Sequence, residues 1–354
     1  MIPANPILGT GLHAIGAAFA ALCYTPQRRV NGWSWQSYWL IQASVCWFLL
    51  PILGAWLTVP DLGRVLLESP RGCMETCFVL GAAYGVGGTA FGIAIRHIGF
   101  SLTYAIAVGL STVLGTLIPP LVSGDLPRLM SQAGAGWVMG GIATGIAGIS
   151  LAGLAGRMKE KDLSSKAGLA GFSLAKGLLL SLLAGVLSAV YGLSLAAGEP
   201  IARVAAAHGA GVFQGNVVYI FANTGAFVSA GFYCLWLHFR HGTLSEMVEL
   251  PAGNETARLP VNWSMALLTG VLWYGQFFFY NLGHVHMGAY QFTSWAIHMI
   301  MLILFSIVVG FLLNEWQGAR RFTRIVVGLA FGVLACAVLF LTYGNRMGEL
   351  AGHH

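Results

Sequence analysis

The chain has 354 residues, of which 57% are hydrophobic and only 8% are charged, with a formal net charge of +6. A soluble protein carries roughly 25% charged residues, so this composition excludes a pair of soluble domains and predicts an all-α polytopic membrane protein. The positive charge does not indicate nucleic-acid binding, because the basic residues lie between apolar segments, where they orient a membrane protein.

Ten stretches are long and apolar enough to predict transmembrane helices, each of which needs about 20 residues. They lie near 8–26, 37–59, 73–95, 101–123, 134–156, 172–194, 216–238, 262–284, 289–312 and 322–343. The loops after odd-numbered spans contain thirteen Lys and Arg residues, and the termini and remaining loops contain five. The positive-inside rule therefore predicts that the odd loops are cytoplasmic and that both termini lie outside.

A basic segment at 157–166 divides the chain into two groups of five spans, 1–166 and 167–354. Five is odd, so a duplication would give an inverted repeat, an architecture of transporters. A shift of 189 residues pairs Gly81 with Gly270, Tyr84 with Trp273, Phe91 with Tyr280, His97 with His286 and Gly99 with Gly288. The alternative is chance matching in a chain that contains 48 glycines.

Polar and aromatic side chains share one face of the eighth and of the ninth predicted span. Helical spacing aligns Trp273, Gln276, Tyr280 and His284 on the eighth, and Gln291, Trp295 and His298, with Ser294 adjacent, on the ninth. A tight turn joins these spans, so we expect the two faces to converge. Aromatic rings cover the C–H faces of a sugar, and amides bind its hydroxyls. The alternative is an interfacial aromatic belt with interhelical hydrogen bonds.

His298 is the most deeply placed titratable residue of any predicted span. An imidazole exchanges protons near physiological pH, which makes His298 a candidate for proton coupling; the alternative is a neutral, hydrogen-bonded ring. His13 is closer to a span end and is a weaker candidate. The other embedded polar residues are expected to make helix-packing hydrogen bonds: Gln42, Gln214, Asn216, Asn223 and Tyr104.

Small residues spaced four apart on the fifth span predict close helix packing, with a sliding surface as the alternative. They are Gly136, Gly140, Thr144, Gly148, Ala152 and Gly156.

Enzyme signatures are absent from the sequence, which has no Walker A loop and no H-E-x-x-H motif. Its six cysteines show no zinc or redox spacing. We therefore expect neither an enzyme nor a cofactor or metal site.

Five segments together resemble a known family. They read LHAIGAAFAALCYTPQRRVNGWSWQ, LGTLIPPLVSGDL, LWYGQFFFYNLGH, SWAIHM and NEWQGARR. Their order and spacing over residues 10–325 are similar to those of the bacterial L-rhamnose–proton symporter family, which belongs to the drug/metabolite transporter superfamily. The matching site positions are Trp273, Tyr274, Gln276, Tyr280, His284, Ser294, Trp295 and His298.

The resemblance implies ten helices in an inverted five-plus-five repeat and residence in the bacterial inner membrane. Both termini, which the positive-inside rule puts outside, would then be periplasmic. The resemblance also implies import of L-rhamnose or a related 6-deoxy sugar with a proton by alternating access. Enterobacterial members carry an acidic residue in a Tyr-Asp-Tyr stretch where this chain reads Tyr290–Gln291–Phe292, so the proton-binding group remains open. The expected partners are the sugar, the proton and the lipid bilayer. Two alternatives are a carrier of the same superfamily for another solute and a non-transporting sugar receptor.

Overall fold

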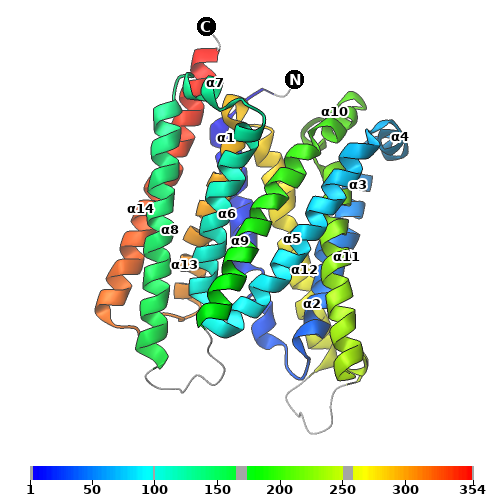
Figure 1. Ribbon diagram of the computed structural model, residues 1–354, viewed down its shortest axis with the longest axis vertical. Helices are drawn as coiled ribbons and strands as arrows, with labels where there is room; N and C mark the ends of the chain where they lie inside the picture. The colour runs from blue at the N-terminus through cyan, green and yellow to red at the C-terminus, as the bar shows by residue number, and fades with distance from the viewer. Residues whose placement is uncertain (1–2, 99, 165–173, 250–257, 353–354) are drawn as a thin grey trace. The chain divides into compact units, whose positions relative to one another are not determined.

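The computed structural model describes residues 3–98, 100–164, 174–249 and 258–352 (Figure 1). Helices are the only regular elements in these ranges. The α-helices are α1 (Pro6–Leu22), α2 (Trp35–Ala43), α3 (Leu50–Thr58), α4 (Leu62–Glu68), α5 (Arg71–Ile98), α6 (Phe100–Val122), α7 (Leu126–Met130), α8 (Ala135–Ser164), α9 (Leu174–Ala197), α10 (Glu199–Ala207), α11 (Asn216–His241), α12 (Leu259–His284), α13 (Ser294–Leu312) and α14 (Arg321–Gly352). The 3₁₀-helical segments are η1 (Pro26–Arg29), η3 (Gly211–Phe213), η4 (Leu244–Met247) and η5 (Gly288–Thr293), and η2 (Ser44–Leu49) is a π-helical segment.

Nine helical segments among the described residues are long and apolar enough to cross a membrane. They overlap all of the predicted spans except the eighth, 262–284. That range forms the 26-residue helix α12, which is long enough to cross but carries Trp, Tyr, Asn and Gln side chains that lower its mean hydropathy. The all-helical membrane class is therefore confirmed, and the one predicted span that is not matched by an apolar segment of this kind is the span that carries the predicted polar face.

The chain divides into two compact units, which are described separately here. The first unit comprises Met1–Ala21, Gly87–Leu193 and Leu282–His354, and the second comprises Leu22–Val86 and Ser194–Asn281. Each unit thus combines segments from both predicted halves of the sequence. The predicted boundary between those halves, at 166, lies outside the described residues.

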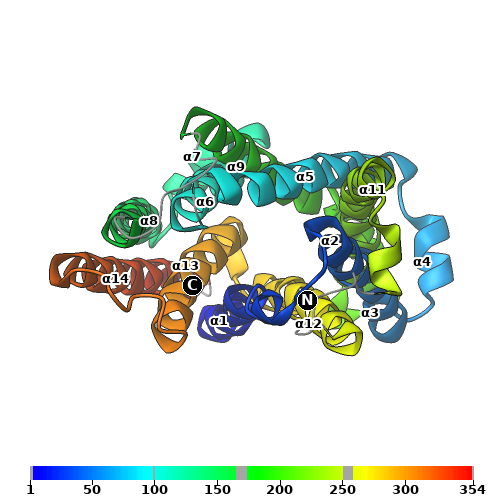
Figure 2. The ribbon, with the colours of Figure 1, turned by 90° about the horizontal axis from the view of Figure 1, so that it is seen from below.

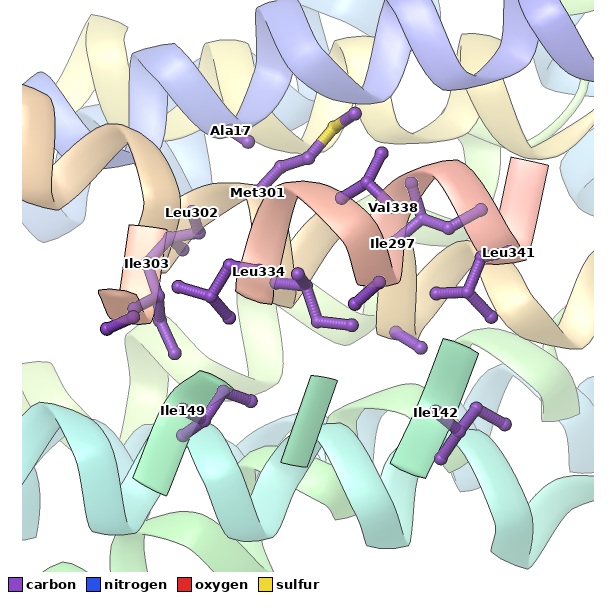
Figure 3. Close-up of a cluster of buried hydrophobic side chains, with 14 of the residues drawn as sticks. Ala17, Ile142, Ile149, Ile297, Met301, Leu302, Ile303, Leu334, Val338 and Leu341 are labelled. Atoms are coloured by element: carbon purple, nitrogen blue, oxygen red, sulfur yellow. The ribbon is translucent and has the colours of Figure 1, made fainter. Parts of the chain in front are cut away.

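The core of the first unit is formed largely by α8, α13 and α14, and α8 and α14 lie side by side along their lengths (Figures 1 and 2). Branched side chains of α14 fill the space between these helices, and Figure 3 shows Leu334 and Leu341 between α14 and α8. A Cβ atom at Gly141 would lie 2.7 Å from Leu341, and one at Gly148 would lie 2.8 Å from Leu334. Glycine is required there because a larger residue would push the two helices apart.

The predicted small-residue stripe of α8 and its contact face coincide only in part. Gly148 lies against α14, whereas a Cβ at Gly136 or Gly140 would meet nothing within 4 Å. The glycines that pack closely include Gly141 and Gly145, which are not members of the stripe. Four-residue spacing drifts around a helix with 3.6 residues per turn, so residues of the stripe gradually leave the contact.

The end of α8 and the start of α14 are joined by a carboxylate cap. Asp162 accepts hydrogen bonds from the Thr323 hydroxyl at 2.6 Å and from the Arg320 backbone N–H at 3.0 Å. Its other oxygen lies 3.2 Å from Nε of Arg320. A carboxylate at a helix N-terminus satisfies free N–H groups and interacts favourably with the helix dipole. Asp162 therefore links two chain segments that are distant in sequence.

Glycines also bring helices of the second unit into backbone contact. A Cβ atom at Gly81 of α5 would collide with the carbonyl oxygen of Ala222 in α11. A Cβ atom at Gly270 of α12 would lie 2.5 Å from the Cβ of Val45 and 2.9 Å from the carbonyl oxygen of Gln42. These contacts hold α5 against α11, and α12 against the segment formed by α2 and η2.

The second predicted span is interrupted by the π-helical segment η2, between α2 and α3. Pro51 lies just beyond η2 in the first turn of α3, and a proline lacks the N–H that would bond to a carbonyl of the preceding turn. The Asn223 side chain approaches the carbonyl oxygen of Cys46 at 3.5 Å. Proline thus explains why the helix widens at η2.

Candidate functional site

Trp273 of α12 lies at the centre of a cluster of aromatic rings in the second unit. Its ring centroid is 5.4 Å from Tyr24, 5.6 Å from Trp39 and 5.2 Å from Trp47. The three interplanar angles lie between 64° and 85°, so the rings meet edge to face, an arrangement that aromatic pairs favour. Tyr84 extends the cluster, with its centroid 5.7 Å from that of Trp47. We call these five residues the Trp273 cluster.

Gln276 and Tyr280 of α12 are also buried in the second unit, whereas His284 at the end of the helix belongs to the first unit. Gln276 is 8% exposed and Tyr280 is 9% exposed. Between them, the Phe277 carbonyl accepts a hydrogen bond of 2.7 Å from the Tyr219 hydroxyl of α11. The polar face predicted for the eighth span is therefore turned into the unit, where its side chains avoid lipid.

The predicted residues of the ninth span lie in the first unit. Ser294 is fully buried, and its hydroxyl lies 3.0 Å from Nδ1 of His284. The indole N–H of Trp295 donates to the backbone carbonyl of Ser111 at 3.0 Å. A Cβ atom at Gly115 would lie 2.5 Å from that indole nitrogen. The Trp295 indole is thus positioned on α6 by a hydrogen bond and by the absence of a side chain at Gly115.

Gln291 differs from the other predicted residues because it is exposed. It belongs to the 3₁₀ segment η5, and α13 begins only at Ser294. The predicted span 289–312 therefore starts too early as an α-helix. Tyr290, with φ −108° and ψ 36°, marks the break. Helical spacing does not apply across it, so Gln291 does not share an α-helical face with Trp295 and His298.

Two histidines from different helices lie close together within the first unit. The ring centroids of His13 in α1 and His298 in α13 are 6.0 Å apart, and the two side chains are 0% and 2% exposed. A Cβ atom at Gly283 would lie 3.0 Å from the His13 ring, so the imidazole sits directly against the backbone of α12. The sequence ranks His13 low because of its place near a span end, but the fold brings it to His298.

Sequence reasoning missed the part of the aromatic cluster that the second span supplies. A signal was available, since Trp39 and Gln42 repeat the W-x-x-Q spacing of Trp273 and Gln276.

The polar residues Asn216 and Asn223 make the helix-packing bonds expected of them, to Thr58 and to the Cys46 carbonyl. Gln42 does not, because neither atom of its buried amide has a hydrogen-bond partner in the described chain.

Metal-binding geometry is absent from the part of the chain that the structure describes, where no three His, Cys, Asp or Glu side chains are grouped to hold an ion. A pocket of about 70 Å³ in the first unit is lined by residues that include Lys159, Glu315 and Trp316. Lys159 lies 3.7 Å from the Glu315 carboxylate and 4.8 Å from the centre of the Trp316 ring. This pocket contains none of the seven predicted substrate-binding residues.

Apolar helices long enough to cross a membrane, with amides, imidazoles and aromatic rings buried among them, define a multi-pass membrane protein. Residues 3–347 match the model of the family described as L-rhamnose-proton symport protein, and the chain belongs to this family. Membership confirms a transporter rather than an enzyme.

The relatives of the chain include curated proteins named L-rhamnose-proton symporter. The protein from Pectobacterium carotovorum is 32% identical over 350 residues, covering 95% of this chain and 98% of the relative. That from Cronobacter sakazakii is 33% identical over 341 residues, covering 95% and 97%. That from Mannheimia succiniciproducens is 31% identical over 345 residues, covering 96% and 98%. The similarity thus extends over nearly the whole of each chain.

Proposed function

We propose that the protein imports L-rhamnose, or a closely related 6-deoxy sugar, together with a proton by alternating access. The family to which the chain belongs and the names of its curated relatives support this function. The observation in the structure that carries the proposal is the Trp273 cluster with Gln276 on the same helix. Aromatic rings and a buried amide on one face suit a ligand that has both C–H faces and hydroxyls.

The proposed sugar-binding residues form two groups, one in each unit. In the second unit they are Trp273, Gln276 and Tyr280, and in the first unit they are Ser294, Trp295 and His298, with Gln291 as an exposed candidate. A buried amide in hydrocarbon is costly unless it has a polar partner, and a sugar hydroxyl provides one for Gln276. The Trp295 indole N–H is already bonded to Ser111, so its proposed contribution is the ring face.

The proposed proton site is His298, with His13 as its neighbour. At a separation of 6.0 Å, two positive charges repel by about 3 kcal/mol at an effective dielectric constant of about 20. The pair therefore accommodates one proton in preference to two. A single exchangeable proton beside buried residues of α13 fits a carrier that couples one ion to one solute.

Ten spans in an inverted five-plus-five repeat, with halves 1–166 and 167–354, form part of the proposal. In that scheme α5 matches α12, and the matched glycines make matched contacts: Gly81 lies against the carbonyl of Ala222, and Gly270 lies against that of Gln42. The matched aromatic residues Tyr84 and Trp273 both contact Trp47. Chance matching of glycines gives no reason for such paired contacts. The pair Gly99 and Gly288 includes a residue outside the described ranges.

We place the protein in the bacterial inner membrane with both termini periplasmic. Within the first unit, basic residues such as Lys159 and Arg320 gather where α8 ends and α14 begins, whereas α1 begins and α14 ends at the opposite end (Figure 1). This separation suits the positive-inside rule, which puts the basic end in the cytoplasm.

The test is uptake by purified protein in proteoliposomes. We expect counterflow of labelled L-rhamnose, competition by related 6-deoxy sugars, and alkalinisation of the external medium when the sugar is added with the membrane potential clamped. Counterflow of a different solute without L-rhamnose transport would reject the substrate. Sugar counterflow without any external pH change would reject proton coupling alone.

A further inference from the structure

Gln42 in α2 is a fully buried residue whose amide nitrogen and amide oxygen both lack a hydrogen-bond partner within the described ranges. The indole N–H groups of Trp39, which precedes it by three residues, and of Trp47 on η2 also lack an acceptor there. These two side chains are 2% and 0% exposed. Buried polar groups without partners are rare in native proteins, because each one loses its bonds to water and gains none in return.

Neighbouring amides in the second unit show that the fold is able to satisfy such groups. Gln36 lies on the same helix as Gln42 and is also buried, and its amide donates to the Thr243 hydroxyl at 2.8 Å. Asn216 donates to the Thr58 hydroxyl at 2.9 Å. The lack of partners is therefore particular to Gln42 and is not a general property of the amides in this unit.

The unpartnered groups belong to the neighbourhood of Trp273. Trp39 and Trp47 are members of the Trp273 cluster, with centroids 5.6 Å and 5.2 Å from that of Trp273. The backbone carbonyl of Gln42 lies against Gly270, which precedes Trp273 by three residues on α12. Close packing of the two helices at Gly270 thus puts Gln42 about one helical turn from Trp273.

The backbone between Gln42 and Trp47 is itself unusual, since η2 is a π-helix that begins at Ser44. Such segments are rare in proteins overall, but those that do occur are often found at functional sites, because they redirect side chains from the regular helical face. Here the π-helix lies directly after Gln42 and carries Trp47.

We propose that Gln42, Trp39 and Trp47 bind hydroxyl groups of the transported sugar, as a second set of polar groups beside Trp273 and Gln276. This inference rests on the proposed function. The amide of Gln42 offers a donor and an acceptor, which matches a hydroxyl that both accepts and donates. An indole N–H only donates, so Trp39 and Trp47 bind hydroxyl oxygens.

The experiment compares Gln42→Leu with the matched variant Gln36→Leu, using purified protein. For each one, the affinity for L-rhamnose and for a panel of singly deoxygenated L-rhamnose analogues is measured by calorimetry, with thermal unfolding of the sugar-free protein alongside. Gln42→Leu should bind L-rhamnose about 10-fold more weakly and unfold at the same or a higher temperature, because it loses an unsatisfied polar group. Gln36→Leu should unfold at a lower temperature and keep its sugar affinity.

The analogue panel gives the decisive reading. One analogue that binds the wild type weakly should lose no further affinity in Gln42→Leu, because the missing hydroxyl and the missing amide are partners. Equal sensitivity of Gln42→Leu and the wild type to every analogue would overturn the inference, as would a lower unfolding temperature with unchanged affinity. If Gln42→Leu does not fold, Gln42→Asn, which keeps the amide but shortens its reach, should show the same loss of sugar affinity with an unchanged unfolding temperature. Wild-type protein that binds no L-rhamnose would reject the proposed function instead.

Discussion

His13 in α1 and His298 in α13 place their imidazole rings edge to face, with centroids 6.0 Å apart and an interplanar angle of 73°. The two residues are separated by most of the chain, and both are buried in the first unit. A third histidine, His284, bonds through Nδ1 to the Ser294 hydroxyl. These buried imidazoles from separate helices are the geometric basis of the proposed proton site.

Replacing His298 by Gln tests proton coupling. Glutamine retains hydrogen-bonding capacity but does not exchange a proton, so His298→Gln should abolish sugar-driven alkalinisation outside vesicles while sugar counterflow persists. The matched control is His241→Gln, since His241 is exposed at the end of α11 and its replacement should leave both readings unchanged. Undiminished alkalinisation in His298→Gln would move the proton site away from this residue.

Gln276→Ala tests the sugar-binding face of α12. Loss of a buried amide that binds a hydroxyl should weaken L-rhamnose binding by about 1–3 kcal/mol. Gln291→Ala removes the same group from an exposed position and should have the smaller effect. The measurement is the dissociation constant from calorimetry, and equal affinities for Gln276→Ala and the wild type would argue that the site is elsewhere.

Gly81→Ala tests the backbone contact between α5 and α11. The added methyl group would collide with the Ala222 carbonyl, so the helices must separate, and overpacking of this kind costs about 1–3 kcal/mol. Gly140→Ala is the control, because open space surrounds Gly140 and alanine favours a helix over glycine by about 1 kcal/mol. Thermal unfolding should therefore shift in opposite directions for the two variants, and a shared direction would contradict the contact.

Asp162→Asn tests the cap that links α8 to α14. Loss of the charge weakens the hydrogen bonds from the Thr323 hydroxyl and the Arg320 backbone N–H and removes the ion pair with the Arg320 side chain, so we expect a lower free energy of unfolding. Asp61→Asn is the matched control, since the Asp61 side chain makes no capping hydrogen bond to α4 and its left-handed φ of 48° also suits asparagine. Hydrogen exchange should show faster opening of the first turn of α14 in Asp162→Asn alone.

The positions of the helices follow closely from the sequence. Long apolar runs separated by charged gaps predict segments that overlap α1, α8 and α14, because a chain in lipid satisfies its backbone polar groups only within helices. The shift of 189 residues also selected Gly81 and Gly270, and each of these glycines makes a close contact with the backbone of a neighbouring helix. The start of α13 could not be predicted from the sequence, since the 3₁₀ segment η5 carries the same apolar pattern as a helix.

The sequence by itself determined that this is a helical membrane protein, and it identified Trp273, Gln276 and His298 as polar or aromatic groups on helical faces, since hydropathy and periodicity are local properties of the chain. Only the tertiary structure decided which neighbours those faces meet. It gave Asn216 a partner, left Gln42 without one among the described residues, and brought His13 to His298. Periodicity specifies the direction of a side chain from its own helix, whereas a hydrogen bond or a close contact depends on the helix packed opposite.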